Sequence, residues 1–309
     1  MKNSKQTVAE VVGVKRAGRD PGYLLLWLVL LLGVVPAVPA AGSPFSEGLL
    51  FRIERSGEPV GFLFGTIHSE DPRVMTLPAV VEQEFLQSPV LCLEVDMAPA
   101  NLLASVSGMF LQDGRRLAEI VGPDLYARLL PVAEKRGIPE VSLRHYKPWA
   151  IAVLLSTPVA QTGEFLDLML YRRALQMEKP VLGLESVSEQ LDLFDSLAER
   201  EQIDLLEESL NNLDQLPTLF QTLLERYLDR DLAGLMAINR QLLQDQGQAF
   251  ASRFQVELLD RRNQRMVERL LAHLDKGGIF IAVGALHLPG EQGMLRLLQK
   301  RGYRVVRKY

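Results

Sequence analysis

The stretch that decides the fold is G-A-L-H at residues 284–287, which closes the apolar run 278–283. A matching stretch, G-T-I-H at residues 65–68, closes the apolar run 61–64 near the front of the chain. In each case a run typical of a buried strand is followed by glycine, two residues and histidine. The pair therefore predicts two strands whose ends deliver His68 and His287.

Two further apolar runs lie between these motifs, and each ends in a glutamate. The runs are V-L-C-L-E at 90–94 and P-V-L-G-L-E at 180–185, and helical patterns precede both of them. Alternating helices and strands predict an α/β (α+β) fold with a mixed central β-sheet and helical connections. Ligands collect beyond the carboxyl ends of strands in such sheets. We therefore expect Glu94, Glu185 and the two GxxH histidines to share one pocket.

The remaining elements complete this sheet and cover it. Residues 49–55 and 60–67 flank the turn-rich quartet S-G-E-P at 56–59, which predicts an antiparallel hairpin. Leucines at helical spacing in residues 188–274 predict three to five helices that form a layer over or beside the sheet. A partner-binding role for this layer would require a large exposed leucine patch. Residues 303–309 predict a terminal strand.

The first 40 residues have the pattern of a targeting segment. Basic residues are followed by an apolar run at 23–35 and by small residues at 36–42, the order of a secretory signal peptide. The apolar run is short for a membrane span, which needs about 20 residues. We expect residues 1–40 to be a signal peptide, or an uncleaved N-terminal membrane anchor, and residues 41–309 to be a single domain. The bulk of the chain would then be exported, to the periplasm, with the N-terminal segment as its one membrane contact.

Composition and charge narrow the class of partner. The chain is 48% hydrophobic and 23% charged, which is ordinary for a globular protein. The formal net charge is −4, and the first 40 residues carry five basic and two acidic side chains, so the rest is more acidic still. This balance argues against nucleic acid, whose binding depends on basic patches. The sole cysteine, Cys92, lies between two leucines and is expected to be a buried, inert thiol.

The residue types at the four strand ends suit hydrolytic chemistry. Two imidazoles and two carboxylates favour a divalent metal such as Zn, Mn or Co. Such a metal lowers the pKa of a bound water and polarises a carbonyl. Without a metal, the same groups could serve as general acid and base. A single strand-end histidine or glutamate is commonly structural, but the repeated motif with two matching glutamates favours a shared site.

Three other polar residues are candidates for the same pocket: Arg262, Asn263 and His145. Asn263 is a poor helix former in the middle of a helical pattern, which suggests a polar role facing the site. Its neighbour Arg262 could serve the same site, or it could simply lie on a solvated face of the helix. His145 precedes a predicted helix and could contact a ligand.

These motifs together resemble the TraB/GumN family, which is related to the Tiki membrane metalloproteases. The resemblance covers roughly residues 48–309. It implies a mixed α/β fold similar to the erythromycin-esterase and ChaN-like proteins, and in the Tiki branch it implies a metal-dependent peptidase. By position it implies working roles for His68, Glu94, Glu185 and His287, with Arg262 and Asn263 in support. The motifs that carry it are 65–68, 93–96, 147–149, 166–167, 183–194, 261–266 and 283–305.

The sequence thus predicts an exported metal-dependent hydrolase that acts on a peptide or amide bond. A divalent Mn, Co or Zn ion would be held by His68, Glu94, Glu185 and His287. These four would be the catalytic groups, with Arg262 and Asn263 holding substrate or the developing oxyanion. The alternative is a non-catalytic periplasmic protein that binds haem, metal or a small molecule in the same pocket. In either case the partner is a peptide or another small molecule.

Overall fold

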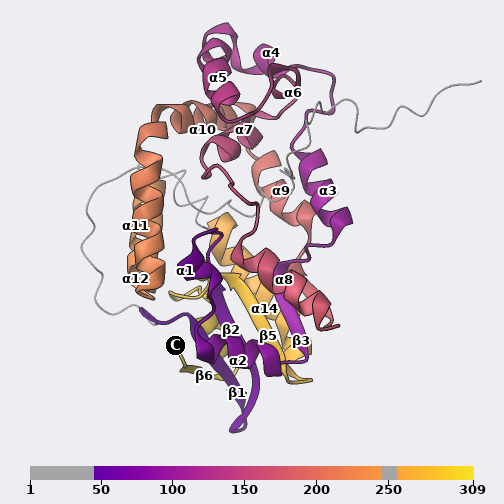
Figure 1. Ribbon diagram of the computed structural model, residues 1–309, viewed down its shortest axis with the longest axis vertical. Coiled ribbons are helices and arrows are strands. Elements are labelled where there is room, and N and C mark those ends of the chain that lie inside the picture. Colours follow the sequence, from indigo (N-terminus) through magenta and orange to yellow (C-terminus); the bar gives the residue numbers. More distant parts are fainter. Residues whose placement is uncertain (1–44, 245–255) are drawn as a thin grey trace, which may run out of the picture.

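The structure is a computed structural model that describes residues 45–244 and 256–309 (Figure 1). Within these residues a mixed six-stranded sheet is flanked by helices, which confirms the predicted α/β fold. The segment 1–40, predicted to be a signal peptide or anchor, lies outside the described residues. In the part of the chain that is described, no helix combines the length and apolar character needed to cross a membrane.

The sheet has four parallel strands, followed at one side by two strands that join it in antiparallel pairing. Its strand order is β4-β3-β5-β2-β1-β6. Strands β4, β3, β5 and β2 pair in parallel, while β1 runs antiparallel to both β2 and β6. The carboxyl ends of the four parallel strands therefore meet at one edge of the sheet. The strands are β1 (Leu50–Arg55), β2 (Glu58–Thr66), β3 (Val90–Val95), β4 (Val181–Glu185), β5 (Ile279–Gly284) and β6 (Arg304–Arg307).

The predicted hairpin is present with a tighter turn than expected. Strand β2 already begins at Glu58, so the turn is the pair Ser56 and Gly57 rather than a quartet. Both turn residues have positive φ, at 53° and 89°. Two consecutive left-handed residues match the right-handed twist of a hairpin. The last strand is likewise shorter than predicted, because β6 covers Arg304–Arg307 alone.

Helices connect the strands and build a second layer beyond the sheet. Those near the sheet are α1 (Pro72–Met75), α2 (Ala79–Gln87), α8 (Leu166–Gln176), α14 (Arg261–Leu274), α15 (Met294–Lys300) and the short η4 (Val256–Asp260) and η5 (Ala285–His287). The others are α3 (Pro99–Gly108), α4 (Leu117–Val121), α5 (Pro123–Lys135), α6 (Glu140–Leu143), α7 (Pro148–Leu155), α9 (Val187–Asp195), α10 (Glu199–Asn211), η3 (Leu213–Gln215), α11 (Leu216–Leu228) and α12 (Leu232–Gln244).

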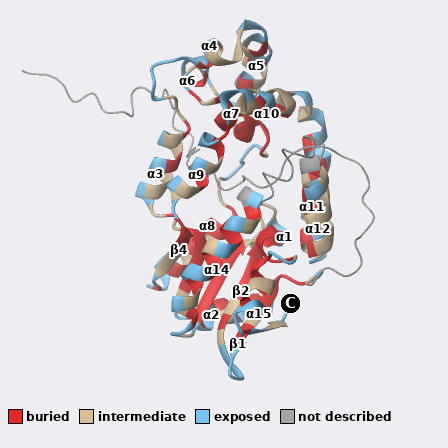
Figure 2. Ribbon diagram, turned by 180° about the vertical axis from the view of Figure 1, so that it is seen from behind, coloured by how far each residue is buried: buried red, intermediate tan, exposed pale blue. Residues whose placement is uncertain are grey.

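Two helix pairs cover opposite faces of the sheet. On one face the ring of Phe280 lies between Phe64 and Phe85, which places α2 against β2 and β5. Arg173 of α8 pairs with Glu82 of α2, so α8 lies on the same face. On the other face, α14 and α15 pack together. Residues buried between these layers form a single apolar core, which appears red in Figure 2.

The predicted helical layer, residues 188–274, divides between two places. Helix α10 packs on α7 in a group of helices at the end of the molecule away from the β1–β2 hairpin (Figure 1). Helices α11 and α12 pack together along one side and reach the sheet, where Tyr227 donates a hydrogen bond to the carbonyl of Gly65 at 2.9 Å. Helices α9 and α14 of the same predicted layer also contact the strand ends, through Gln190 and Arg262.

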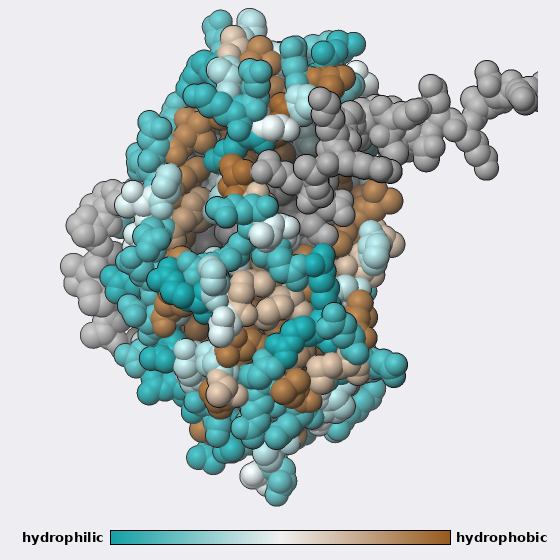
Figure 3. Space-filling view, viewed as in Figure 1, coloured by the Kyte–Doolittle hydropathy of each residue, from teal (hydrophilic) through white to brown (hydrophobic). Residues whose placement is uncertain are grey.

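The described surface shows no leucine patch over this layer. Among the described residues, Val256 is the one large exposed hydrophobic side chain between 188 and 274. The face drawn in Figure 3 is largely hydrophilic, with hydrophobic residues scattered between polar ones. Such scattered exposure is normal for a folded domain and does not indicate a docking surface.

Candidate functional site

The four residues predicted from the strand ends all follow neighbouring parallel strands. Glu185 is the last residue of β4, Glu94 is the penultimate residue of β3, His287 ends η5 directly after β5, and His68 follows β2 by two residues. All four side chains are buried. Burying ionisable groups is costly unless each has a partner, so their partners decide what this edge of the sheet can do.

Arg262 joins the two glutamates. Its guanidinium donates to Glu185 Oε2 from Nη2 at 2.6 Å and from Nε at 2.9 Å, and Nη2 also donates to Glu94 Oε1. The side chain is 2% exposed. Burial acts to lower the pKa of Arg262, but the two carboxylates outweigh it and raise that pKa. Arg262 therefore lies at the centre of a buried ion-pair cluster, and the alternative of a solvated helix face is wrong.

Glu185 is fully engaged by arginines. Its second oxygen, Oε1, accepts from Nη2 of Arg265 at 3.1 Å, one turn along α14 from Arg262. Both carboxylate oxygens of Glu185 therefore already receive charged donors. In this arrangement Glu185 anchors α14 to the end of β4.

Glu94 is held in its ionised form but keeps one oxygen turned away from Arg262. Burial acts to raise the pKa of Glu94, and the positive charge of Arg262 overcomes it and holds the pKa at about 2. Oxygen Oε1 also accepts from Gln190 of α9 at 2.9 Å. Oxygen Oε2 accepts the backbone N–H of Gly284 at 3.2 Å.

The tautomer of His287 follows from its contact with Asn263. The amide nitrogen of Asn263 donates to the backbone carbonyl of Gln292 at 2.8 Å, which fixes the orientation of the amide. Its oxygen, Oδ1, lies 2.6 Å from Nδ1 of His287. A carbonyl oxygen only accepts hydrogen bonds, so Nδ1 carries the proton. In the neutral ring, Nε2 then has a bare lone pair.

That lone pair faces a carboxylate. Nε2 of His287 lies 3.5 Å from Oε2 of Glu94 and makes no hydrogen bond within the described part of the chain. Burial lowers the pKa of His287 to about 4, so the ring is neutral near pH 7. Two acceptors thus point at each other, an arrangement that calls for a cation or a hydrogen-bond donor between them.

His68 has a different partner. Its Nε2 lies 3.2 Å from Oδ2 of Asp167, a residue in the first turn of α8. The other oxygen of Asp167 accepts from the hydroxyl of Thr66 at 2.8 Å. The ring of Phe165 packs on His68, with ring centroids 5.0 Å apart. The two GxxH histidines therefore have different partners: His287 lies between Asn263 and Glu94, and His68 lies beside Asp167.

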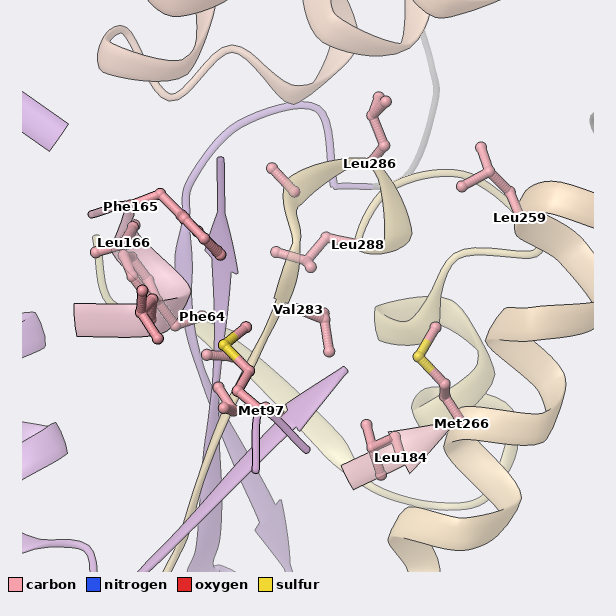
Figure 4. Packing of buried hydrophobic residues seen from close by; sticks show 14 of the residues in the cluster. Phe64, Met97, Phe165, Leu166, Leu184, Leu259, Met266, Val283, Leu286 and Leu288 are labelled. Atoms are coloured by element: carbon pink, nitrogen blue, oxygen red, sulfur yellow. The ribbon is translucent and has the colours of Figure 1, made fainter. Parts of the chain in front are cut away.

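The two halves of the site are close enough to interact. The charge of His68 acts on the pKa of both Glu94 and His287. Apolar side chains surround this edge of the sheet, as Figure 4 shows for Val283 of β5, Leu288 just after η5, Phe165 just before α8 and Met266 of α14. A water-poor surrounding strengthens every electrostatic interaction within it.

The donor set fits a divalent cation only in part. Two ligands about 2.1 Å from one ion lie about 3 to 3.5 Å apart, and the separation of His287 Nε2 from Glu94 Oε2 meets this condition. The outer hydrogen bond from His287 to Asn263 is also typical of a metal-binding histidine. Within residues 45–244 and 256–309, however, no three His, Cys, Asp or Glu side chains are grouped to hold a metal as they stand.

The sequence analysis gave no role in the site to Asp167, Gln190 or Arg265, although Leu166 and Asp167 fit the family pattern. A signal existed for Asp167, because it is an acidic residue among Phe165, Leu166 and Leu168. The structure also gives Asn263 a different geometry from the predicted substrate contact, since both ends of its amide are already used. His145 is exposed in the turn between α6 and α7, in the group of helices at the end of the molecule away from the β1–β2 hairpin (Figure 1).

Comparison with known proteins assigns the family. The model of the TraB/PrgY/gumN family matches residues 49–307, which is most of the chain and includes all of the strands described above. The chain belongs to the TraB/PrgY/gumN family. The resemblance inferred from the GxxH and glutamate motifs is thereby confirmed.

The chain is similar to named metalloproteases and to an uncharacterized bacterial protein. Metalloprotease TIKI1 of Danio rerio is 26% identical over 87% of this chain and 65% of its own length. Metalloprotease TIKI1 of Homo sapiens is 26% identical over 84% and 61%. The chain therefore spans less than two thirds of the length of these relatives. Uncharacterized protein YbaP of Escherichia coli is 25% identical over 77% of this chain and 87% of its own length. No solved structure matches.

Proposed function

We propose that this chain is an exported, metal-dependent hydrolase of peptide or amide bonds. The observation that carries the proposal is the pair of buried acceptors, His287 Nε2 and Glu94 Oε2, which face each other at 3.5 Å. Two relatives that bear the name metalloprotease support the same reading. Export to the periplasm rests on the targeting pattern of residues 1–40.

A Mn, Co or Zn ion, when bound, would supply an activated water at neutral pH and polarise the scissile carbonyl. His287 would hold it through Nε2, Glu94 through Oε2, and His68 from the end of β2. Glu185, which the sequence also predicted as a ligand, would act through Arg262 instead, because arginines already occupy both of its oxygens.

The chain's own residues prepare this site in three ways. Asn263 keeps the proton on Nδ1 of His287 and so leaves Nε2 available as a ligand. Arg262 pairs with both Glu94 and Glu185, and its positive charge holds the pKa of Glu94 low in an apolar surrounding. Asp167 Oδ2 lies 3.2 Å from Nε2 of His68 and is placed to orient that imidazole. These are positioning roles that bring the reacting groups into a defined geometry.

Metal content and peptide hydrolysis test this function. Purified protein should bind about one equivalent of Mn, Co or Zn, and His287→Ala and His68→Ala should lose it. His145→Ala provides a matched control, because His145 is exposed and remote from the site in the fold. Wild-type protein should cleave members of a fluorogenic peptide library in a chelator-sensitive manner. Absence of both metal binding and cleavage with all three ions would overturn the proposal.

A further inference from the structure

A single carboxylate ties the loop after His68 to the loop before α8. Glu70 accepts the backbone N–H groups of three successive residues: Gln161 and Thr162 at 2.9 Å on Oε2, and Gly163 at 2.8 Å on Oε1. Gly163 has a φ of 75°, a left-handed conformation that turns its N–H toward the same point as its neighbours. Successive N–H groups arranged in this way form a binding site for an anion. In this protein the anion is the Glu70 side chain.

The loop held by Glu70 has little else to fix its position. Residues 159–162 are exposed, and burial resumes only at Phe165. The backbone contact with Glu70 therefore takes the place of side-chain packing for this part of the chain. Because the N–H groups of a surface loop are otherwise solvated, three charge-assisted hydrogen bonds to one carboxylate give the loop a defined conformation.

The far end of this loop carries the partners of His68. Phe165, two residues beyond the clamped glycine, packs its ring on the His68 imidazole. Asp167, two residues further, lies 3.2 Å from His68 Nε2. At the other end of the connection, Glu70 itself lies only two residues after His68. The contact between Glu70 and residues 161–163 therefore lies within a few residues of His68 on one side and of Phe165 and Asp167 on the other.

We propose that Glu70 is a positioning residue that sets the His68 imidazole against Asp167 and Phe165 by clamping the backbone of residues 161–163. This inference rests on the proposed function insofar as His68 works in hydrolysis. In this proposal Glu70, which is partly exposed and lies outside the predicted catalytic set, fixes the geometry of the buried His68.

The clamp can be tested without any assay of activity. The protein has four histidines, so ¹⁵N-histidine NMR gives a simple spectrum that single His→Gln variants assign. In Glu70→Ala the His68 signals should shift, while those of the exposed His145 remain. Hydrogen exchange of a peptide that covers residues 158–165 should rise at least tenfold in the same variant. Glu70→Gln keeps one acceptor oxygen and should give a smaller change in both measurements.

Glu82→Gln is a matched control. Glu82 also links the front of the chain to α8, but its partner Arg173 lies in the last turn of that helix, away from the loop that precedes the first turn. It should leave both the His68 signals and the exchange of residues 158–165 unchanged. An exchange increase in Glu70→Ala without movement of the His68 signals would show a loop tie with no positioning role and overturn the inference. Unchanged exchange would show that the clamp does not exist in solution.

Kinetics separate this inference from the proposed function. If wild-type protein hydrolyses peptides, Glu70→Ala should lower kcat by about tenfold to a hundredfold with little change in KM, the effect expected when a reacting group is misplaced. Glu70→Gln should recover part of the loss. If wild-type protein hydrolyses nothing, the proposed function fails, and the NMR and exchange results still decide the clamp. If Glu70→Ala does not fold, the graded effect of Glu70→Gln decides it.

Discussion

His287 and Glu94 come from adjacent parallel strands and present two acceptor atoms to each other, Nε2 and Oε2, at 3.5 Å. Each of the two groups is held by a hydrogen bond at its other polar atom. Asn263 holds the proton on the opposite nitrogen of the imidazole, and Arg262 engages the opposite oxygen of the carboxylate. Both residues come from the first turn of α14, so a single helix end orients the two groups.

The hydrogen bond from His287 to Asn263 should control metal affinity. Asn263→Leu removes the acceptor that fixes the tautomer, so Nε2 is protonated in part of the population and cannot bind a metal. Loss of such an outer partner typically weakens metal binding by about 10- to 100-fold. Isothermal titration with Mn or Zn would measure the change. Gln264→Leu, at the exposed next position of α14, is the control and should bind as wild type does.

The two glutamates should differ in their response to neutralisation. Glu94→Gln removes the charge from the oxygen that faces His287, and metal affinity should fall by at least tenfold. In Glu185→Gln, metal affinity should change far less, because Glu185 contacts Arg262 and Arg265 rather than the open side of the site. Equal losses in the two variants would support the four-ligand set predicted from the sequence and contradict the geometry.

Much of this site could be predicted because its residues lie at the ends of apolar runs. Such runs predict buried strands, and a polar residue at the end of a buried strand in an α/β sheet is placed where ligands bind. Glu94, Glu185 and His287 were found in this way. Their order in the sheet could not be predicted, because the insertion of β5 between β2 and β3 depends on contacts between segments nearly 190 residues apart in sequence.

Residues on helices were harder to predict. Asp167 and Gln190 each occupy one position of an amphipathic helix, where a polar side chain is usually solvated. Their burial results from the packing of α8 and α9 on the strand ends, which periodicity alone does not reveal. The role of Glu70 could not be predicted from the sequence, because its partners are backbone N–H groups, which nearly every residue type provides.

The glycines of the two GxxH motifs should not be equivalent. A Cβ added at Gly65 would lie 3.0 Å from Leu288 Cδ2 and 3.2 Å from both Cα and Cβ of Ala285, so these neighbours would have to move by a few tenths of an ångström. A Cβ added at Gly284 would meet its nearest atoms at an ordinary 3.5 Å. Gly65→Ala should therefore lower the free energy of unfolding by about 1 to 3 kcal/mol. Gly284→Ala should cost clearly less.

Urea denaturation of both variants at pH 7.5 measures this difference, and the midpoints should be compared at equal m-values. If Gly284→Ala proves as costly as Gly65→Ala, the close approach of η5 to the end of β2 does not explain the first motif. Its glycine would then be required for another reason.

The stability of the metal-free protein should fall as the pH drops below 6.5, and His287 should cause part of that fall. Burial lowers the pKa of His287 from its ordinary 6.5 to about 4. Between these two values the unfolded chain binds a proton that the folded chain does not, so acid favours unfolding. Across the whole window the effect amounts to about 3 kcal/mol. The depressed pKa of Glu94 acts in the same direction but at lower pH, between its ordinary 4.5 and about 2.

The free energy of unfolding in urea, measured at pH 7 and at pH 4.5 after treatment with chelator, tests the contribution of His287. His287→Asn cannot take up this proton, so its stability should decline less over that interval than the stability of wild type. What matters is the difference between the two pH values, because the substitution also changes stability at pH 7. His145→Asn removes an exposed histidine and should keep the wild-type decline. Identical declines in wild type and His287→Asn would mean that His287 is not held neutral in the folded protein, and the lone pair at Nε2 would no longer follow from its surroundings.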